Sequence, residues 1–264
     1  MKKHLHLFLY ALSITICVLF YLFHPYFVRL NKHSKQTSII SWGFVPNTFE
    51  HTPMPTAGGL DLLNKHNGIF VGNTQKKEIY FTFDLGSESG FTDSILNILK
   101  VNNLKAIFFL GGDYISEERL IHRMITEGHL IGNHTNKHED LPMLSKKNIK
   151  KDIFTFQENF KNSYPNYEVK FFRPPYGRFD RRVLKIAQAS GMKSVLWSIA
   201  IVDWEEAPPL DITLNANKIA QRLHPGAILL LHIRNPGAPE LLKSLLPQIA
   251  EKGYRVGNPN DLLE

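Results

Sequence analysis

Residues 78–84 of this 264-residue chain read EIYFTFD, a largely apolar run that is rich in aromatic residues and ends in a carboxylate. Such residues favour strands, and nearly continuous apolar strands are typical of a parallel sheet that is buried on both faces. A second run, 227–232, reads AILLLH and ends in a histidine. Packing alone gives neither run a reason to end in a titratable group, so both ends are candidate sites of chemistry.

Outward from these two runs, predicted strands alternate with amphipathic helices. The further strands are expected at 106–110, 129–132, 169–172, 194–198 and 254–256. The helices are expected at 92–101, 117–127, 146–161, 180–190, 215–223 and 239–252. This alternation predicts an α/β fold in which helices cover a parallel sheet. Six or seven such units in about 190 residues are slightly few for an eight-unit barrel.

The positive charge of the chain is concentrated at its N-terminus. The net charge is +7, yet residues 1–40 contain five Lys or Arg and no Asp or Glu, which leaves +2 for residues 41–264. The body therefore lacks the charge excess that binding to a phosphate backbone relies on, and we expect no nucleic-acid partner. A single cysteine, Cys17, excludes an intrachain disulfide and a cysteine-type zinc site.

Residues 7–23 form an uncharged apolar run, LFLYALSITICVLFYLF, that follows two lysines. Its 17 residues are a marginal but adequate length for a membrane span, and no small-x-small cleavage site follows. We predict a signal anchor at 1–23, a basic stalk at 24–40, an N-terminal extension at 41–76 that wraps the fold, and a main domain at 77–264. A cleaved signal, and hence a secreted protein, is the alternative.

Polar residues follow the predicted strands, at the edge where ligand sites of parallel α/β folds form. In chain order they are Asp84, His134 with His138, Arg173, Asp203 and His232. The two histidines of HTNKH, four residues apart on a helical turn, could bind one divalent metal. The alternative is a pair of surface histidines on a polar loop.

The remaining rim residues suit acid–base catalysis. Asp84 is a candidate general base, and Arg173 would keep it ionised. His232 is a candidate general acid that Asp203 would orient and keep charged. Each also has a purely structural interpretation: a loop carboxylate, a salt bridge or a core histidine. Together with a metal, the set suits hydrolysis of an amide or ester, and no nucleophilic serine or cysteine motif competes with it.

Five motif regions, in order, resemble those of the polysaccharide deacetylases, also known as the NodB homology domain or carbohydrate esterase family four. They are TFD at 82–84, HTNKH at 134–138, RPPYG at 173–177, DW at 203–204 and LLH at 230–232. The resemblance implies a distorted (β/α)7-type barrel that acts outside the cytoplasm. The resemblance implies that Asp84 is the catalytic base, that Arg173 tunes the pKa of this base, and that Asp203 and His232 form the acid pair. It further implies that His134 and His138 bind the metal and that the Tyr176 N–H donates to the oxyanion. Leu230 would form the wall of the acetyl pocket, and Trp204 matches the aromatic residue of the fourth motif.

The segments 41–44, 72–74, 86–92 and 202–204 are also similar to the spore-cortex branch of this family. Enzymes of that branch remove the N-acetyl group of muramic acid in peptidoglycan on the way to muramic δ-lactam. The resemblance therefore implies a peptidoglycan substrate and a role in sporulation or germination. The alternatives are a deacetylase of N-acetylglucosamine or chitooligosaccharide, and a wall-binding pseudoenzyme.

Leu85 departs from the family pattern, in which a second aspartate at this position is the third metal ligand. The δ-lactam branch typically has asparagine there, but leucine cannot coordinate a metal at all. Catalytic zinc sites usually have three protein ligands, so we expect zinc or a similar divalent ion to bind weakly or not at all, with Glu88 as a candidate replacement ligand. Alternatively, the histidines would bind the sugar directly by hydrogen bonds.

Overall fold

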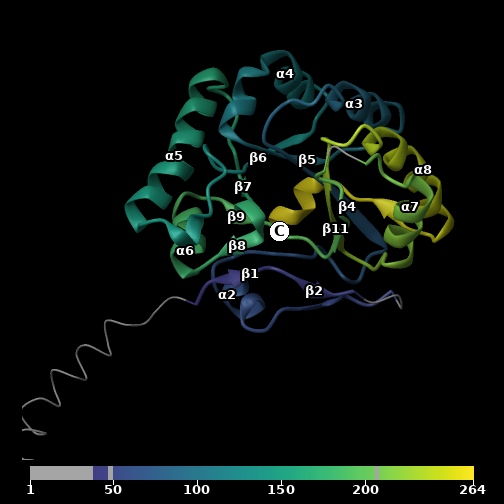
Figure 1. Cartoon of the computed structure of the whole chain (residues 1–264), viewed down its shortest axis with the longest axis horizontal. Helices are drawn as coiled ribbons and strands as arrows, with labels where there is room; N and C mark the ends of the chain where they lie inside the picture. The colour runs from purple at the N-terminus through teal and green to yellow at the C-terminus, as the bar shows by residue number, and fades with distance from the viewer. Residues whose placement is uncertain (1–37, 47–49, 206–207) are drawn as a thin grey trace, which may run out of the picture. The chain divides into compact units, whose positions relative to one another are not determined.

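A curled sheet of eight parallel strands lies at the centre of the computed structural model, which describes residues 38–46, 50–205 and 208–264 (Figure 1). The strand order is β10-β11-β4-β5-β6-β7-β9, and β12 pairs with β4. Their bounds are β4 Glu78–Leu85, β5 Ile107–Leu110, β6 Leu130–Asn133, β7 Phe171–Phe172, β9 Lys193–Ser194, β10 Ile199–Ala200, β11 Ala227–His232 and β12 Arg255–Val256. The expected parallel α/β fold, curled into an incomplete barrel, is confirmed.

The central strand β4 is buried along its whole length, and its alternating side chains serve two different cores. Ile79 through Leu85, at the odd positions, belong to the large apolar cluster shared with the surrounding helices. Tyr80 belongs to a separate cluster inside the curl of the sheet. Because side chains of a strand alternate between faces, Asp84 faces the interior of the curl whereas Leu85 faces the helices.

Helices cover the outer face of the sheet (Figure 1). They are α3 Thr92–Val101, α4 Glu118–Thr126, α5 Lys146–Ser163, α6 Arg181–Ala189, α7 Ile212–Gln221 and α8 Ala238–Glu251. The prediction was wrong about the start of α7, which begins three residues before the expected 215. The Asp211 carboxylate accepts a hydrogen bond from the Leu214 N–H and so caps the helix there.

The strand expected at 194–198 is divided, which corrects the prediction. Its beginning forms β9 at one edge of the sheet, and β10 starts at Ile199 on the other edge. Between them, Ile69 of the N-terminal extension donates its N–H to Ser194 O at 2.8 Å and accepts from Leu196 N at 2.8 Å. A segment more than a hundred residues away therefore bridges the opening of the curled sheet.

The rest of the extension packs on the same side of the fold. Its elements are β1 Ile40–Ser41, β2 Phe44–Val45, β3 Met54–Pro55 and α2 Gly59–Lys65. Strand β1 pairs with β8, Arg178–Phe179, in antiparallel fashion, and the buried Trp42 donates its Nε1–H to Trp197 O at 2.9 Å. These contacts hold the turn that precedes β8, and this turn contains the predicted RPPYG motif at 173–177.

The predicted signal anchor at 1–23 and most of the stalk at 24–40 lie outside the described residues. Among the residues that are described, none of the helices has both the length and the apolar character that crossing a membrane requires.

Candidate active site

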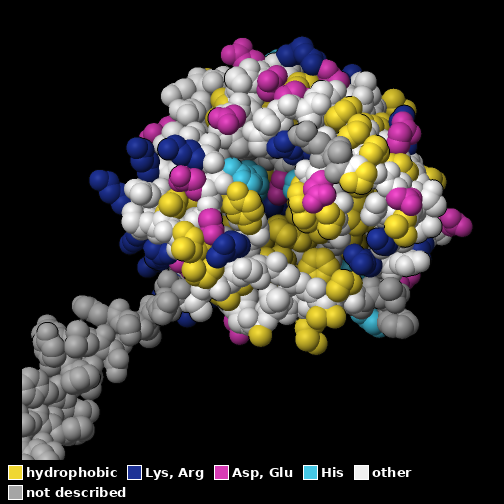
Figure 2. All heavy atoms as spheres, in the orientation of Figure 1, with side chains coloured by type: hydrophobic (Ala, Val, Ile, Leu, Met, Phe, Trp, Pro, Cys, Tyr) yellow, Lys and Arg dark blue, Asp and Glu magenta, His cyan; other side chains and the backbone are white. Residues whose placement is uncertain are grey.

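The predicted rim residues meet at the carboxyl ends of neighbouring strands. Strands β11 and β4 are in a register that pairs His232 with Asp84, and β6 and β7 are in a register that pairs Asn133 with Phe172. His134 and Arg173 therefore follow at the same edge of the sheet. Figure 2 shows histidine, acidic and basic side chains gathered at a hollow near the middle of this face.

Arg173 is fully buried and holds Asp84 in place. Its Nη1 donates to Asp84 Oδ1 at 2.8 Å, and its Nε donates to Val195 O at 2.9 Å. The guanidinium also stacks over the Phe109 ring, with 4.1 Å between Cζ and the ring centroid. Val195 directly follows β9 and donates its own N–H to Phe172 O at 2.8 Å, while its carbonyl accepts from Arg173 instead of from a strand.

The balance of forces on Asp84 favours the ionised carboxylate. Burial opposes ionisation, but the nearby charge of Arg173 and its hydrogen bond outweigh that effect, so the pKa of Asp84 lies below its usual value. The second carboxylate oxygen, Oδ2, lies 3.6 Å from His134 Nε2. Asp84 is thus available as a proton acceptor at neutral pH.

The two histidines of HTNKH lie on a tight loop after β6 and not on the predicted helical turn. Thr135 and His138 have left-handed backbones, with φ of 69° and 56°. Asn133 Oδ1 accepts from Thr135 N at 2.7 Å, and Thr135 Oγ1 accepts from His138 N at 3.0 Å. These bonds bend the loop so that the imidazoles of His134 and His138 still meet, with 4.9 Å between ring centroids and a 67° interplanar angle.

Both imidazoles have the protonation state that a metal requires. His134 Nδ1 donates to Arg173 O at 2.8 Å, which directs the lone pair of Nε2 toward the site. Burial lowers the pKa of His134 to about 4 and also lowers the pKa of His138. The two neutral rings fit one divalent ion. However, Leu85 faces the helices, and the described part of the chain contains no group of three or more His, Cys, Asp or Glu side chains that could hold a metal.

Glu88 has a structural role, which argues against the proposed replacement ligand. Its Oε1 accepts from Gly90 N at 2.6 Å, and its Oε2 accepts from both Thr92 Oγ1 and Tyr114 OH at 2.6 Å. Both carboxylate oxygens are therefore occupied in holding the loop that leads into α3.

His232 and Asp203 form a second charged pair. His232 Nδ1 donates to Asp203 Oδ1 at 2.7 Å, and the backbone N–H of His232 donates to Oδ2 at 2.8 Å. Burial opposes a charged imidazole, but the hydrogen bond and charge of Asp203 outweigh it, so the pKa of His232 is raised above its usual value. The imidazole thereby retains a proton that it can donate near neutral pH.

Aromatic side chains stand on two sides of the hollow. The Tyr176 ring lies 4.7 Å from the His138 ring, and the Trp204 ring lies 5.9 Å from the His232 ring. Both aromatics are exposed. Leu230 is buried in β11, two residues before His232 and in register with Thr82. Tyr176 has a left-handed backbone with φ of 58°, the kind of strained conformation that is often found at functional sites.

Two further residues that shape the site were not predicted from the sequence. Asn133 bends the histidine loop and also donates its Nδ2–H to Ile153 O at 3.0 Å. Asp152, on α5, accepts from Lys137 N at 3.0 Å and thus fixes the middle of the same loop. Asn133 directly precedes His134 at a predicted strand end, which is a usable signal. Asp152 has none, since only the packing of α5 places it there.

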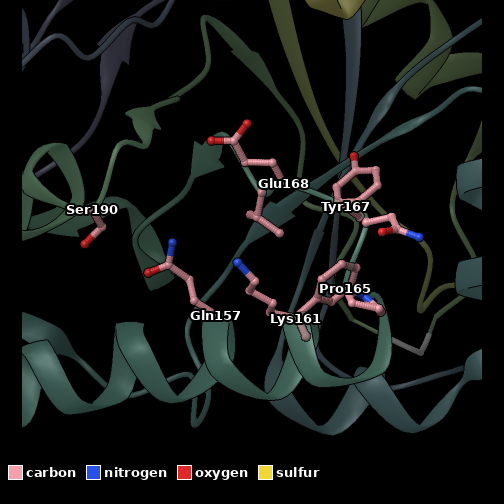
Figure 3. A pocket seen from close by; sticks show the side chains of 9 residues that line it. Gln157, Lys161, Pro165, Tyr167, Glu168 and Ser190 are labelled. Atoms are coloured by element: carbon pink, nitrogen blue, oxygen red, sulfur yellow. The ribbon is translucent and has the colours of Figure 1, made fainter.

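A pocket of about 360 Å³ lies away from these residues (Figure 3). Lys161, Tyr167, Glu168 and Ser190 are among its lining residues, and Tyr167 and Glu168 precede β7. It therefore adjoins the amino end of β7, whereas the candidate catalytic residues follow the carboxyl ends. The size of a pocket alone does not identify the site.

A family model and several known proteins are similar in sequence to this chain. A family model for polysaccharide deacetylase matches residues 71–195. The peptidoglycan-N-acetylmuramic acid deacetylase PdaA of Bacillus subtilis is 34% identical over 227 residues, which cover 85% of this chain and 86% of PdaA. A peptidoglycan-N-acetylglucosamine deacetylase of Bacillus cereus is also 34% identical, over 73% of this chain and 70% of that protein.

Solved structures of such proteins have the same fold. The structure of B. subtilis PdaA, a family 4 carbohydrate esterase, superimposes with a TM-score of 0.81 and 32% identity, covering 86% of this chain and 97% of that one. A family 4 pseudoenzyme from Bacillus anthracis gives a TM-score of 0.68 and 29% identity, over 75% of this chain and 69% of that one. The fold, the arrangement of the motifs and these similarities show that the chain belongs to the polysaccharide deacetylases, carbohydrate esterase family 4.

Proposed function

We propose that this member of a family of N-acetyl amide hydrolases acts on the N-acetylmuramic acid of peptidoglycan, on the way to muramic δ-lactam. One observation carries the proposal of turnover: Asp84 and His232 lie side by side on neighbouring strands with oppositely tuned pKa values. Two titratable groups whose environments separate their pKa values in this way suit a base and an acid in one reaction.

The reaction follows from these protonation states. Asp84 accepts a proton from a water molecule whose oxygen attacks the acetyl carbonyl carbon. His232, charged through Asp203, then donates its proton to the sugar nitrogen as the C–N bond breaks. The products are acetate and a free amine. The backbone N–H of Tyr176 is the proposed donor to the oxyanion, and Leu230 and Trp204 are proposed to hold the acetyl group and the sugar ring.

Deacetylases of this family are metal-dependent in general. In this chain His134 and His138 would hold the ion, which would supply a Lewis acid that polarises the acetyl carbonyl. With leucine at position 85, we propose that zinc or a similar ion binds weakly. A pseudoenzyme is the competing proposal, because a relative of known structure is described as one.

The similarity to PdaA extends beyond the motifs and supports muramic acid as the substrate. The match to PdaA covers 85% of the chain, which is more than the 188 residues of the main domain at 77–264. It therefore includes part of the N-terminal extension that closes the sheet. We further propose that the enzyme acts outside the cytoplasm in sporulation or germination, at the membrane through residues 1–23, or as a secreted protein if that segment is cleaved.

Release of acetate tests the proposal. The full chain is incubated with peptide-stripped peptidoglycan strands, with and without a chelator, and mass spectrometry of the digested product identifies the sugar that has lost its acetyl group. We expect loss from muramic acid, and a rate at least about 10²-fold lower for Asp84→Asn. Loss from glucosamine instead would support the N-acetylglucosamine or chitooligosaccharide alternative. Binding of the strands without acetate release would support the pseudoenzyme.

A further inference from the structure

A second pocket, of about 310 Å³, is built from residues that lie close in sequence to Asp84 and His232. It is lined by Ser87, Glu88, Ser89, Phe91, Arg234 and Pro236. These residues belong to the two loops that follow β4 and β11, the strands that end in the base and the acid. The volume is at the lower end of the range for small-molecule sites, sufficient for a substituent that extends from the reacting sugar.

The backbone around Arg234 is held on both sides. Ser89 Oγ donates to Ile233 O at 2.7 Å and thereby ties the two loops together. Asn235 is buried, and its side chain donates to Glu205 O at 2.8 Å and accepts from Gly237 N at 2.9 Å. Arg234 therefore projects from a fixed position next to the general acid, as a recognition residue requires.

The lining residues suit a ligand group that combines a negative charge with apolar carbon atoms. Arg234 is the cation among the lining residues, and Phe91 and Pro236 are apolar. The Glu88 carboxylate also lines the pocket, but its two oxygens are held by the Gly90 N–H and by the hydroxyls of Thr92 and Tyr114. Arg234 already makes at least one interaction within the protein. A guanidinium has five N–H donors, so it can keep that partner and still bind a carboxylate.

We infer that Arg234 binds the lactyl carboxylate of the N-acetylmuramic acid whose acetyl group is removed, and so determines the choice of sugar. The inference rests on the proposed function. The acetamido and lactyl groups are on adjacent ring carbons, and N-acetylglucosamine has a neutral hydroxyl at the lactyl position. Two residues of chain span at most about 7 Å, so Arg234 and His232 are close enough to contact neighbouring substituents of one sugar.

Calorimetry on the full chain tests this inference without turnover. In an Asp84→Asn background, the probes are a peptide-free oligosaccharide of N-acetylglucosamine and N-acetylmuramic acid and the same oligosaccharide with its lactyl groups converted to carboxamides. We expect the carboxylate form to bind about 10-fold to 100-fold more tightly, the range for a charge-assisted hydrogen bond. Adding Arg234→Gln should abolish this preference.

Two further variants show whether the effect belongs to this guanidinium. Arg234→Lys retains the charge and should retain part of the preference. Arg181→Gln, at an exposed position on α6 outside the pocket, should leave the preference unchanged. Equal binding of the two probes, no binding of either, or a preference that persists in Arg234→Gln would overturn the inference.

Failure of this inference and failure of the proposed function give different results. The binding preference is measured without catalysis, whereas the proposed function is tested by which sugar loses its acetyl group. Deacetylation of muramic acid with equal binding of both probes would refute only the role of Arg234. A carboxylate preference that depends on Arg234, in a chain that releases no acetate, would refute only the proposed turnover.

Discussion

Replacing Arg173 with methionine should reveal how strongly the fold depends on the buried pair at its centre. The variant leaves Asp84 buried without its cationic partner, and it removes the donors that reach Val195 O and Leu196 O. Breaking a buried ion pair by removing one partner typically costs about 3–5 kcal/mol. At about 2–4 °C per kcal/mol for a domain of this size, the melting temperature should fall by about 6–20 °C.

The pH dependence of this loss separates an electrostatic cause from a cavity. In the native protein the pKa of Asp84 is lowered, so its ionisation stabilises the fold above the unfolded value of about 4, and this contribution disappears as the pH falls through the native pKa. Loss of Arg173 removes the largest of the effects that lower the pKa of Asp84 and leaves only the His134 and His232 charges to oppose burial, so this pKa should rise. That variant is expected to lose stability as the pH rises, so its difference from the wild type should grow between pH 3 and pH 7.

Urea unfolding of a double-mutant cycle measures both effects. Asp84→Asn combined with Arg173→Met should be less destabilised than the sum of the single variants, because no unpaired charge remains buried. Arg181→Met, at an exposed position on α6, is the matched control and should stay within about 0.5 kcal/mol of the wild type. A loss below about 1 kcal/mol for Arg173→Met, or a loss independent of pH, would refute the reasoning.

Three other results are expected. Asp203→Asn should lower the pKa of His232, so the basic limb of the kcat/KM profile should move to lower pH; an unchanged limb would exclude His232 as the acid. Calorimetric titration with zinc should give an affinity weaker than nanomolar, because the histidine loop supplies two imidazoles; nanomolar binding would contradict the weak-site proposal. Gly177→Ala should destabilise the fold by at least about 1 kcal/mol in urea unfolding, since φ is +61° and the new Cβ would lie 2.7 Å from Trp197 Cη2. Gly86→Ala, whose Cβ would meet nothing within 4 Å, is its control and should be nearly neutral.

Much of the secondary structure followed from local patterns. The helix expected at 92–101 is α3 Thr92–Val101, and the runs at 78–84 and 227–232 are β4 and β11. Such elements are predictable because hydrophobic period, capping residues and β-branched content act over a few neighbours in the chain. The polar residues that end these strands could also be predicted to share one edge, since parallel strands present their carboxyl ends together.

Local patterns did not reveal how the curled sheet closes or how the buried charges are balanced. The pattern of segment 194–198 predicts one strand, yet its carbonyl groups accept hydrogen bonds from Ile69, Arg173 and Trp42. Arg173 and Asp84 are 89 residues apart, and only the folded chain brings them within 2.8 Å. Likewise, the hydrogen bonds that the Asn133 and Thr135 side chains accept, together with the packing of α5, bring the two histidine rings together, and a helical period does not. Pairing and desolvation depend on which distant segments become neighbours, and a one-dimensional pattern does not contain that information.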